Sequence, residues 1–327
     1  MKVFVGCDLG GTNIKAGLVD MDTGEVLISD SMPTQSRKGP ESVLRRMADL
    51  IGALIEKSDI NKEKIGGLGI SAPGVIDLDT NTTLFLPNLY GEWKNIPVGE
   101  RMSEYLGLEV SMLNDVRAIT YGEWAFGAGK EVDSMACFAI GTGVGGGLVV
   151  NNQLVLGFGG TAGELGHQTV DLTGPVCGCG NRGCIEVYAS GPAIAAMAAR
   201  GVRQGWSTKI AELIDNDLNK LTPAIVSKAA KMGDEFANEV WQRAGSFLGV
   251  GVANILTCVG VKMVVIGGGV AKAGDLLLDP IRKEVEKRVF LMPVEKVEIL
   301  TAKLGSDAGI VGMAAWSARQ QGIEIHV

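Results

Sequence analysis

The sequence predicts an α/β protein built from two related halves. Apolar runs typical of strands are interleaved with stretches of helical periodicity along the whole chain. A strand, a glycine-rich hairpin and a second strand occur near the N-terminus, and the same series recurs in the middle of the chain. Gly11-Thr12 aligns with Gly141-Thr142 at an offset of 130 residues (141 − 11 = 130). Such short identities also arise by chance among many glycines, but the shared context favours duplicated halves with a ligand cleft between them.

Turn signals and apolar periodicity predict strands and helices for the first half. The strands are expected at residues 3–5, 16–19, 25–29, 65–71 and 109–113. A helix is expected at residues 40–57, where Val43, Met47 and Leu50 share one face, and another at residues 98–106. We therefore expect a first α/β half that ends near residue 117.

A helix at residues 116–126 marks the expected boundary with the second half. Strands are expected there at residues 135–140, 148–150, 263–266 and 297–300. Helices are expected at residues 194–202, 237–256, 277–289 and 308–318. The predicted division is a small domain of residues 1–117 joined by about 306–327, and a large domain of residues 118–305.

Composition argues against several classes of function. The formal net charge of −7 and the pI near 5.1 disfavour nucleic-acid binding, which needs clustered Lys and Arg. No apolar run reaches the roughly 18 residues of a membrane helix, and a charged residue comes too early for a signal peptide. We therefore expect a cytoplasmic protein in which Cys7, Cys137 and Cys258 are free thiols. His326, beside the C-terminus, is expected to be an exposed tail residue.

Three of the six cysteines lie close together and predict a metal site. Cys177, Cys179 and Cys184 have C-x-C-x4-C spacing, and His167 precedes them. Three thiolates and one imidazole make a complete tetrahedral zinc set, which leaves no open position and indicates a structural role. The alternative, a disulfide or merely buried thiols, does not suit this spacing in a chain without secretory features.

Two carboxylates, Glu164 and Glu186, are interleaved with these ligands although zinc does not need them. Charged acceptors form strong hydrogen bonds with hydroxyl groups. A metal site that holds both carboxylates rigidly near one another therefore indicates a pocket for a polyhydroxylated ligand.

The glycine-rich segments point to phosphate binding, but not through a Rossmann or Walker site. Residues 141–146 match G-x-G-x-x-G, yet they lead into a strand rather than a helix, and no Walker sequence occurs. Glycine hairpins can still cradle phosphates through backbone N–H groups, with hydroxyls from Thr12 and Thr142 and a charge from Lys15. Asp8, at a strand end, is placed to hold hydrated Mg²⁺. The alternative for each loop is an ordinary tight turn.

These segments resemble the ROK family, which groups sugar kinases and related repressors within the actin-like ATPase superfamily. The resemblance covers essentially the whole chain. It rests on residues 8–15 (DLGGTNIK), 114–118 (NDVRA), 140–147, 164–167 (ELGH), 177–186 (CGCGNRGCIE) and 267–269. It implies the actin-like, duplicated ribonuclease H-like fold with two α/β domains and a cleft between them.

The resemblance also implies an ATP-dependent hexokinase that uses Mg²⁺ and contains structural zinc. Pro87-Asn88-Leu89 followed by Trp93 is most similar to bacterial-type glucokinases, so glucose and its 6-hydroxyl are the expected substrate and acceptor. The implied sugar-binding residues are Gly74, Asn88, Asn114, Asp115, Glu164, His167 and Glu186. The implied nucleotide-binding residues are Asp8, Gly10, Gly11, Thr12, Asn13, Lys15, Thr142, Gly143, Gly267 and Gly268.

The general base implied by the resemblance is Asp115. Phosphoryl transfer needs positioning, charge stabilisation and one base near the attacking hydroxyl. From the residues alone, a helix N-cap before Val116 is the favoured interpretation of Asp115. His167 can give one ring nitrogen to zinc and turn the other toward the sugar.

Several alternatives remain open at this stage. The hexose is expected to be glucose, with fructose, mannose, allose and N-acetylmannosamine as alternatives, and ADP or polyphosphate are possible donors besides ATP. A sugar-responsive regulator is disfavoured because the sequence opens with a strand and has no basic helix. A silent sugar-binding protein is disfavoured because both Asp8 and Asp115 are present. We also expect a homodimer or homotetramer.

Overall fold

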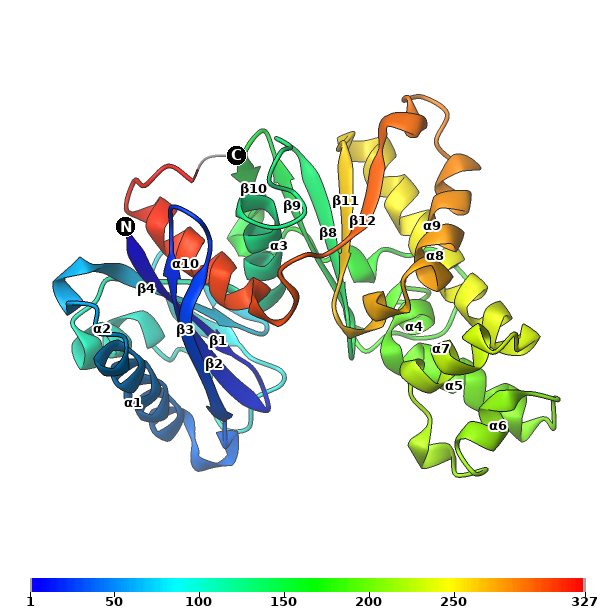
Figure 1. Ribbon diagram of the computed structural model, residues 1–327, viewed down its shortest axis with the longest axis horizontal. Helices are drawn as coiled ribbons and strands as arrows, with labels where there is room; N and C mark the ends of the chain where they lie inside the picture. The colour runs from blue at the N-terminus through cyan, green and yellow to red at the C-terminus, as the bar shows by residue number, and fades with distance from the viewer. Residues whose placement is uncertain (1, 326–327) are drawn as a thin grey trace. The chain divides into compact units, whose positions relative to one another are not determined.

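The computed structural model describes residues 2–325, so His326 and its predicted place in the tail lie outside the described residues (Figure 1). The chain divides into two compact units. The first contains Met1–Asp133, Gly147–Gly163 and Lys303–Val327, and the second contains Ser134–Gly146 and Glu164–Ala302. Compared with the predicted division, the first unit also takes in the helix after residue 117 and a hairpin segment from the middle of the chain.

The first sheet is mixed and has the strand order β3-β2-β1-β4-β7. Its strands are β1 (Val3–Leu9), β2 (Asn13–Asp20), β3 (Val26–Pro33), β4 (Ile65–Ala72) and β7 (Val110–Asn114). β1 pairs antiparallel with β2 through the predicted glycine hairpin, and parallel with β4, which in turn is parallel to β7. The five strands expected from the sequence are therefore confirmed, with ends shifted by a few residues.

The second sheet repeats this arrangement strand for strand, in the order β10-β9-β8-β11-β12. Its strands are β8 (Met135–Ile140), β9 (Val144–Val150), β10 (Gln153–Leu154), β11 (Met263–Gly267) and β12 (Glu298–Thr301). β8, β11 and β12 are parallel, as β1, β4 and β7 are, and β9 and β10 form the antiparallel edge. The equal topology confirms the duplication that the offset of the glycine loops predicted.

Helices connect and cover the strands. They are α1 (Pro40–Lys57), α2 (Val98–Leu106), α3 (Asp115–Ala125), α4 (Glu186–Ala189), α5 (Gly191–Arg203), α6 (Lys209–Leu213), α7 (Pro223–Lys231), α8 (Glu235–Val259), α9 (Asp275–Glu286) and α10 (Ala308–Gln320). The helices expected from periodicity all appear. The sequence-based prediction missed the hairpin of β5 (Val75–Asp77) and β6 (Thr82–Phe85), along with β10, α4 and α6, because such short elements contain too few residues to show a period. It also missed α7, which is as long as the predicted α2.

Two glycines explain how α10 packs on the first sheet. Gly6 of β1 and Gly69 of β4 are register partners on neighbouring strands. A Cβ atom at Gly6 would lie 1.8 Å from the Ile310 carbonyl oxygen, and one at Gly69 would lie 2.0 Å from that of Met313. Larger side chains would therefore force α10 off the sheet.

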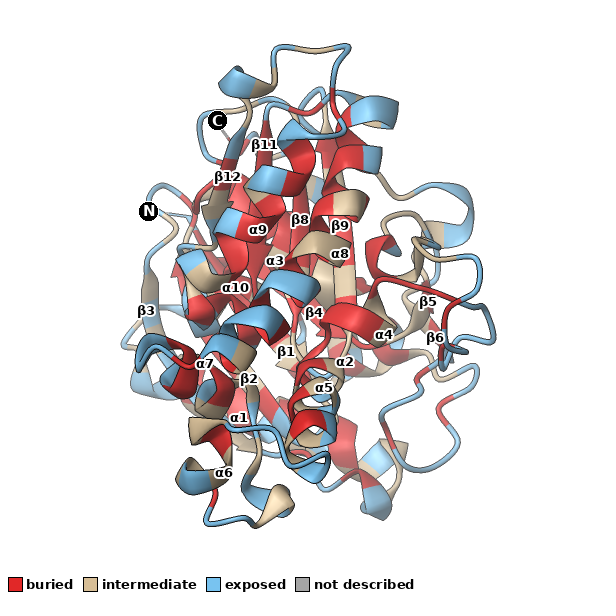
Figure 2. Ribbon diagram, turned by 90° about the vertical axis from the view of Figure 1, so that its right-hand side faces the viewer, coloured by how far each residue is buried: buried red, intermediate tan, exposed pale blue. Residues whose placement is uncertain are grey.

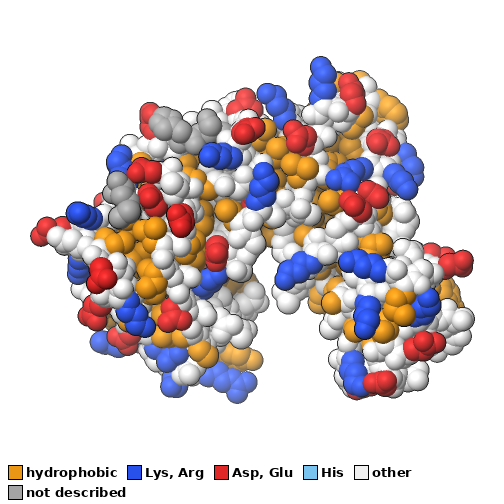
Figure 3. Space-filling view, viewed as in Figure 1, with side chains coloured by type: hydrophobic (Ala, Val, Ile, Leu, Met, Phe, Trp, Pro, Cys, Tyr) orange, Lys and Arg blue, Asp and Glu red, His pale blue; other side chains and the backbone are white. Residues whose placement is uncertain are grey.

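Burial follows the expected layers of an α/β protein. The central strands are almost wholly buried, whereas loops and the outer faces of helices are exposed (Figure 2). On the face seen in Figure 3, Lys and Arg side chains are interspersed with Asp and Glu. Within residues 2–325, no helix combines the length and apolar character that crossing a bilayer requires.

Candidate active site

In the first unit, three polar residues end up side by side at the carboxyl ends of parallel strands. Asp8 of β1 is the register partner of Ser71 on β4, and Ala72 of β4 is the partner of Asn114 on β7. Ligands of open α/β sheets bind beyond this edge of the sheet. The register therefore places Asp8 and Asn114 at the same edge of the sheet, on the two strands that flank β4.

Ser71 orients the carboxylate of Asp8. The Ser71 hydroxyl donates to Asp8 Oδ1 at 2.6 Å, and the Ser71 side chain is fully buried. Burial raises the pKa of Asp8 above its ordinary value, while the Ser71 hydrogen bond and the charge of Lys15 act in the opposite direction. Sequence reasoning missed Ser71, whose only signal was its position at the end of a predicted strand.

The ammonium group of Lys15 lies against the segment that precedes α10. Lys15 Nζ donates to the carbonyl oxygen of Ser306 at 2.9 Å and pairs with the carboxylate of Asp307. Its hydrogen-bonding capacity is thus partly used inside the first unit, next to the predicted phosphate loop. Asp307 carried no sequence signal, because the contact joins residues nearly three hundred positions apart.

The glycine hairpin between β1 and β2 is held from two sides. Thr34 donates its backbone N–H to the Thr12 carbonyl at 2.8 Å and its hydroxyl to the Gly10 carbonyl at 2.7 Å. On the other side, a Cβ atom at Gly11 would lie 2.6 Å from the Asn88 carbonyl oxygen. Gly11 and Asn88, predicted to bind different ligands, are therefore neighbours. The side chain of Asn88 is exposed.

Two polar residues lie where β7 ends and α3 begins: Asn114 and Asp115. Asn114 is the N-cap of α3: its Oδ1 accepts from the N–H groups of Val116 at 3.0 Å and Arg117 at 3.3 Å. Its Nδ2 donates to the Gly74 carbonyl at 3.1 Å. Asp115 is the first residue of α3, and its Oδ1 accepts from Val116 N–H at 2.8 Å. The cap that the sequence assigned to Asp115 as an alternative therefore belongs to Asn114.

In the second unit, the four candidate metal ligands come together. The ligand atoms of His167, Cys177, Cys179 and Cys184 all lie within 4.8 Å of one another. Cys179 Sγ is 3.8 Å from Cys184 Sγ, and His167 Nδ1 is 3.7 Å from Cys177 Sγ. Tetrahedral zinc with bonds of about 2.3 Å to sulfur and 2.0–2.1 Å to nitrogen requires separations of roughly 3.5–3.8 Å. These two separations are thus close to tetrahedral values, the cluster could hold a metal ion, and its three cysteines are free thiols rather than disulfides.

Glu186 lies between this cluster and the second glycine loop. Its Oε2 accepts from the Val144 N–H at 3.0 Å, and its Oε1 is 3.5 Å from Cys177 Sγ. A Cβ atom at Gly143 would lie 2.4 Å from Glu186 Oε2, so glycine is needed there. Glu164 is exposed, and its carbonyl accepts from the His167 N–H at 3.0 Å. Nδ1 of His167 faces the cluster, which leaves Nε2 as the nitrogen for another partner.

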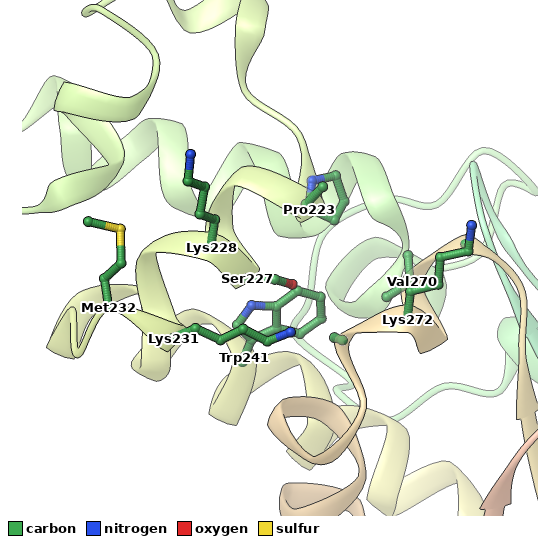
Figure 4. Close-up of a pocket in the computed structure, with 11 residues that line it drawn as sticks. Pro223, Ser227, Lys228, Lys231, Met232, Trp241, Val270 and Lys272 are labelled. Carbon is green, nitrogen blue, oxygen red and sulfur yellow. The ribbon is translucent and has the colours of Figure 1, made fainter.

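A cavity of about 500 Å³ opens beside the third glycine segment. Gly268 has φ +83°, and a Cβ atom there would lie 2.3 Å from the Ile140 carbonyl, so this segment packs on the end of β8. Figure 4 shows Trp241 near Ser227 and Lys231, with Val270 and Lys272 on the facing segment. The lining residues are Pro223, Ala224, Ser227, Lys228, Lys231, Met232, Trp241, Gly269, Val270, Lys272 and Ala273. The sequence pointed to Gly267–Gly269 but missed the α7 wall, whose residues carry no motif.

The predicted sugar-binding residues belong to both units. Gly74, Asn88, Asn114 and Asp115 lie in the first, and Glu164, His167 and Glu186 lie in the second. Within the units, the structure joins Gly74 to Asn114 and brings Glu186 beside the metal-ligand cluster.

Two sheets of equal topology, each with a glycine hairpin between its first two strands, define the actin-like ATPase fold. The chain belongs to the ROK family, which it matches over residues 4–320. It is 35% identical to a glucokinase of Thermotoga maritima, over 95% of this chain and 96% of that protein. It also matches the crystal structure of a ROK family glucokinase from Streptomyces griseus in complex with glucose and AMPPNP. That match has a TM-score of 0.80 and 33% identity, and covers 97% of this chain and 99% of the other.

Some relatives of this chain are named as repressors rather than as kinases. A xylose repressor of Bacillus subtilis is 32% identical over 95% of this chain, which corresponds to 76% of the repressor. Proteins named as kinases and as repressors therefore share this fold. The fold alone does not decide between the two functions, and the residues of the site have to be considered.

Proposed function

We propose that this protein is a glucokinase, which transfers the γ-phosphoryl group of ATP to the 6-hydroxyl of glucose. Its membership of the ROK family and its full-length similarity to proteins named glucokinase support a sugar kinase. The observation that carries the catalytic part is the position of Asp115. Its carboxylate directly follows the carboxyl end of β7, beside a capping Asn114 that fixes the backbone.

Asp115 is the proposed general base. The 6-hydroxyl loses its proton to the Asp115 carboxylate as its oxygen bonds to the γ-phosphorus and the bond to ADP breaks. Asn114 supports this role by positioning: its side chain bonds to α3 and to Gly74 and so fixes the backbone from which Asp115 projects.

The proposed substrate contacts use the residues that the sequence predicted. We assign hydrogen bonds to the sugar hydroxyls to Gly74, Asn88, Asn114, Glu164, His167 and Glu186. For the nucleotide, residues 10–13, Thr142 and Gly143 face the phosphates, and the cavity beside Gly267–Gly269 takes the nucleoside. Lys228, Lys231 and Lys272 give this cavity a cationic lining that suits an anionic ligand. Lys15 lies next to the first phosphate loop.

Two metal ions complete the proposal. Zinc would be held by His167, Cys177, Cys179 and Cys184, whose spacing fits a closed tetrahedral site, and would keep Glu186 in place. Magnesium would be held by Asp8 through water and would neutralise charge on the ATP phosphates.

A hexose panel tests the function. ATP consumption by the purified protein with Mg²⁺ is measured with glucose, fructose, mannose, allose, N-acetylmannosamine and xylose, and the phosphorylated position is read by NMR. A buried polar group left unpaired costs about 1–3 kcal/mol. We therefore expect kcat/KM for glucose to exceed that of each epimer by roughly one or two decades, with product at the 6-hydroxyl.

Other outcomes separate the parts of the proposal. A higher kcat/KM for fructose or N-acetylmannosamine would overturn glucose as the substrate and leave the sugar-kinase assignment standing. Sugar binding without ATP consumption would instead indicate a regulator of the repressor type. Replacing ATP by ADP or polyphosphate in the same assay tests the phosphoryl donor.

A further inference from the structure

Helix α4 (Glu186–Ala189) positions a proposed sugar-binding carboxylate but is only one turn long. A single turn has almost no stability of its own, because helix nucleation fixes several residues for one hydrogen bond. Its orientation therefore depends on side-chain contacts. Glu186 points to the second glycine loop, and Tyr188, two positions later and about 200° around the helix, points to the opposite side.

Tyr188 joins α4 to the loop that carries the candidate metal ligands. Its hydroxyl donates to Asp171 Oδ2 at 2.7 Å, and its ring stacks on Phe247 of α8 with centroids 3.7 Å apart. Asp171 is itself fixed, because Oδ1 accepts from both the N–H and the hydroxyl of Thr173 at 2.9 Å. The hydrogen bond from Tyr188 lowers the pKa of Asp171, and burial raises the pKa of Tyr188 to about 12, so the acceptor is ionised and the donor protonated near neutral pH.

One glycine leaves room for the Tyr188 hydroxyl, and a second lets the chain pass close to the backbone of Asp171. A Cβ atom at Gly174 would lie 2.2 Å from the Tyr188 hydroxyl oxygen. A Cβ atom at Gly183 would lie 1.7 Å from the Asp171 carbonyl oxygen, and Gly183 also has φ +62°. The backbone on both sides is therefore shaped around the contact between Asp171 and Tyr188.

The loop thus has two separate connections to α4. One is the contact of Cys177 Sγ with Glu186 Oε1 at 3.5 Å, which belongs to the metal-ligand cluster. The other, between Asp171 and Tyr188, uses none of the four candidate ligands. The second connection therefore adds to the first without passing through a metal ligand.

We propose that Tyr188 and Asp171 form a positioning pair that helps to set the orientation of Glu186 toward the sugar, through a contact that uses none of the four candidate metal ligands. Neither residue acts on the reacting atoms; both act through α4. The inference rests on the proposed function, in which Glu186 accepts hydrogen bonds from sugar hydroxyls.

The test is Tyr188→Phe, which keeps the ring stacked on Phe247 and removes only the hydroxyl. Weaker positioning of Glu186 lowers sugar binding in the ground state and the transition state alike, which raises KM at constant kcat. We expect KM for glucose to rise roughly 5- to 10-fold, which is less than the direct loss of a hydrogen bond to a charged group, because the effect reaches the sugar only through α4. We expect kcat and the KM for ATP to stay within about twofold, and the zinc content to remain that of the wild type.

Tyr105→Phe is the matched control. Tyr105 donates to the Glu41 carboxylate at 2.6 Å on the first unit, so the same chemical change is made away from α4. Its KM for glucose is expected to equal that of the wild type. Asp171→Asn keeps an acceptor for Tyr188 and should give a smaller rise in KM than Tyr188→Phe.

An unchanged KM for glucose in Tyr188→Phe overturns the positioning pair, and so does a parallel loss of zinc, which would place the hydrogen bond in the metal site. Failure of the proposed function is seen separately, as a wild-type protein that phosphorylates no hexose. In that case hydrogen exchange decides the inference: backbone amides of residues 184–191 should exchange faster in Tyr188→Phe than in Tyr105→Phe, and equal rates overturn it.

Discussion

At the scale of single residues, the structure shows which of two adjacent side chains, Asn114 or Asp115, is the N-cap of α3. A helix that begins at the carboxyl end of a strand needs a cap for its first N–H groups, and both Asn and Asp can supply one. Asn114 accepts from two of these groups, and Asp115 follows as the first helical residue. Asp115 is therefore not required as the cap, which supports a catalytic role for its carboxylate.

Asp115→Asn should abolish turnover and leave glucose binding nearly intact. The amide has the same size but cannot take a proton from the 6-hydroxyl, and general-base catalysis contributes about 10²–10⁴-fold. Steady-state kinetics and calorimetric glucose titration measure the two effects. Asp275→Asn is the matched control, because Asp275 is also the first residue of its helix, and it should retain wild-type kcat. A kcat above roughly a tenth of wild type in Asp115→Asn would rule out the base.

At the scale of elements, a single loop connects metal chemistry to the proposed sugar site. Residues 167–184 contain the four candidate ligands, and the chain then enters α4 at Glu186. Folding free energy and metal binding are coupled wherever the ligands come together only in the folded state. The orientation of Glu186 should therefore depend on the metal as well as on Tyr188.

Cys184→Ser should lose both the metal and the affinity for glucose. Serine replaces the buried thiolate with a much weaker zinc ligand, so the zinc content should fall from one ion per chain toward none and KM for glucose should rise at least tenfold. Elemental analysis and kinetics test both. Cys258→Ser changes an exposed cysteine outside the cluster and should change neither quantity. Wild-type protein purified without chelator but lacking zinc would contradict the metal assignment.

At the scale of the whole molecule, two copies of one sheet topology carry different sites. The first unit supplies Asp8, Asn114 and Asp115 at its strand ends, and the second supplies the cavity beside Gly267–Gly269 and the Cys and His cluster. Duplication thus provides two equivalent strand–hairpin–strand frameworks, and the insertions after each framework distinguish their functions.

Glucose should stabilise the folded protein. A ligand that binds only the native state adds about 2.7 kcal/mol at a hundred times its dissociation constant. The midpoint of thermal unfolding should therefore rise by a few degrees with glucose. L-Glucose at the same concentration controls for the general effect of a polyol and should produce a much smaller shift. Equal shifts with the two enantiomers would show that no stereospecific glucose site is present.

The sequence by itself determined the elements and the motifs, because both depend on local patterns. Helices α1 and α2 were predicted with the bounds that the structure has, since apolar side chains repeat at helical spacing over several turns. The four candidate metal ligands were likewise predictable, since Cys177, Cys179 and Cys184 lie within one short loop. Short elements such as β5 and α4 escaped prediction because they contain too few residues to show a period.

Only the tertiary structure decided which distant residues meet. Ser71 reaches Asp8 because β1 and β4 are parallel neighbours, and Asp307 reaches Lys15 because α10 returns to the first sheet. Neither contact leaves a periodic or spacing signal, since each joins residues far apart along the chain. The same holds for Tyr188 and Asp171, whose hydrogen bond needs a glycine at position 174 to leave room for the Tyr188 hydroxyl. Motifs within a short segment can be recognised from the sequence alone. Contacts between residues far apart in the chain depend on packing and on strand register, which only the tertiary structure shows.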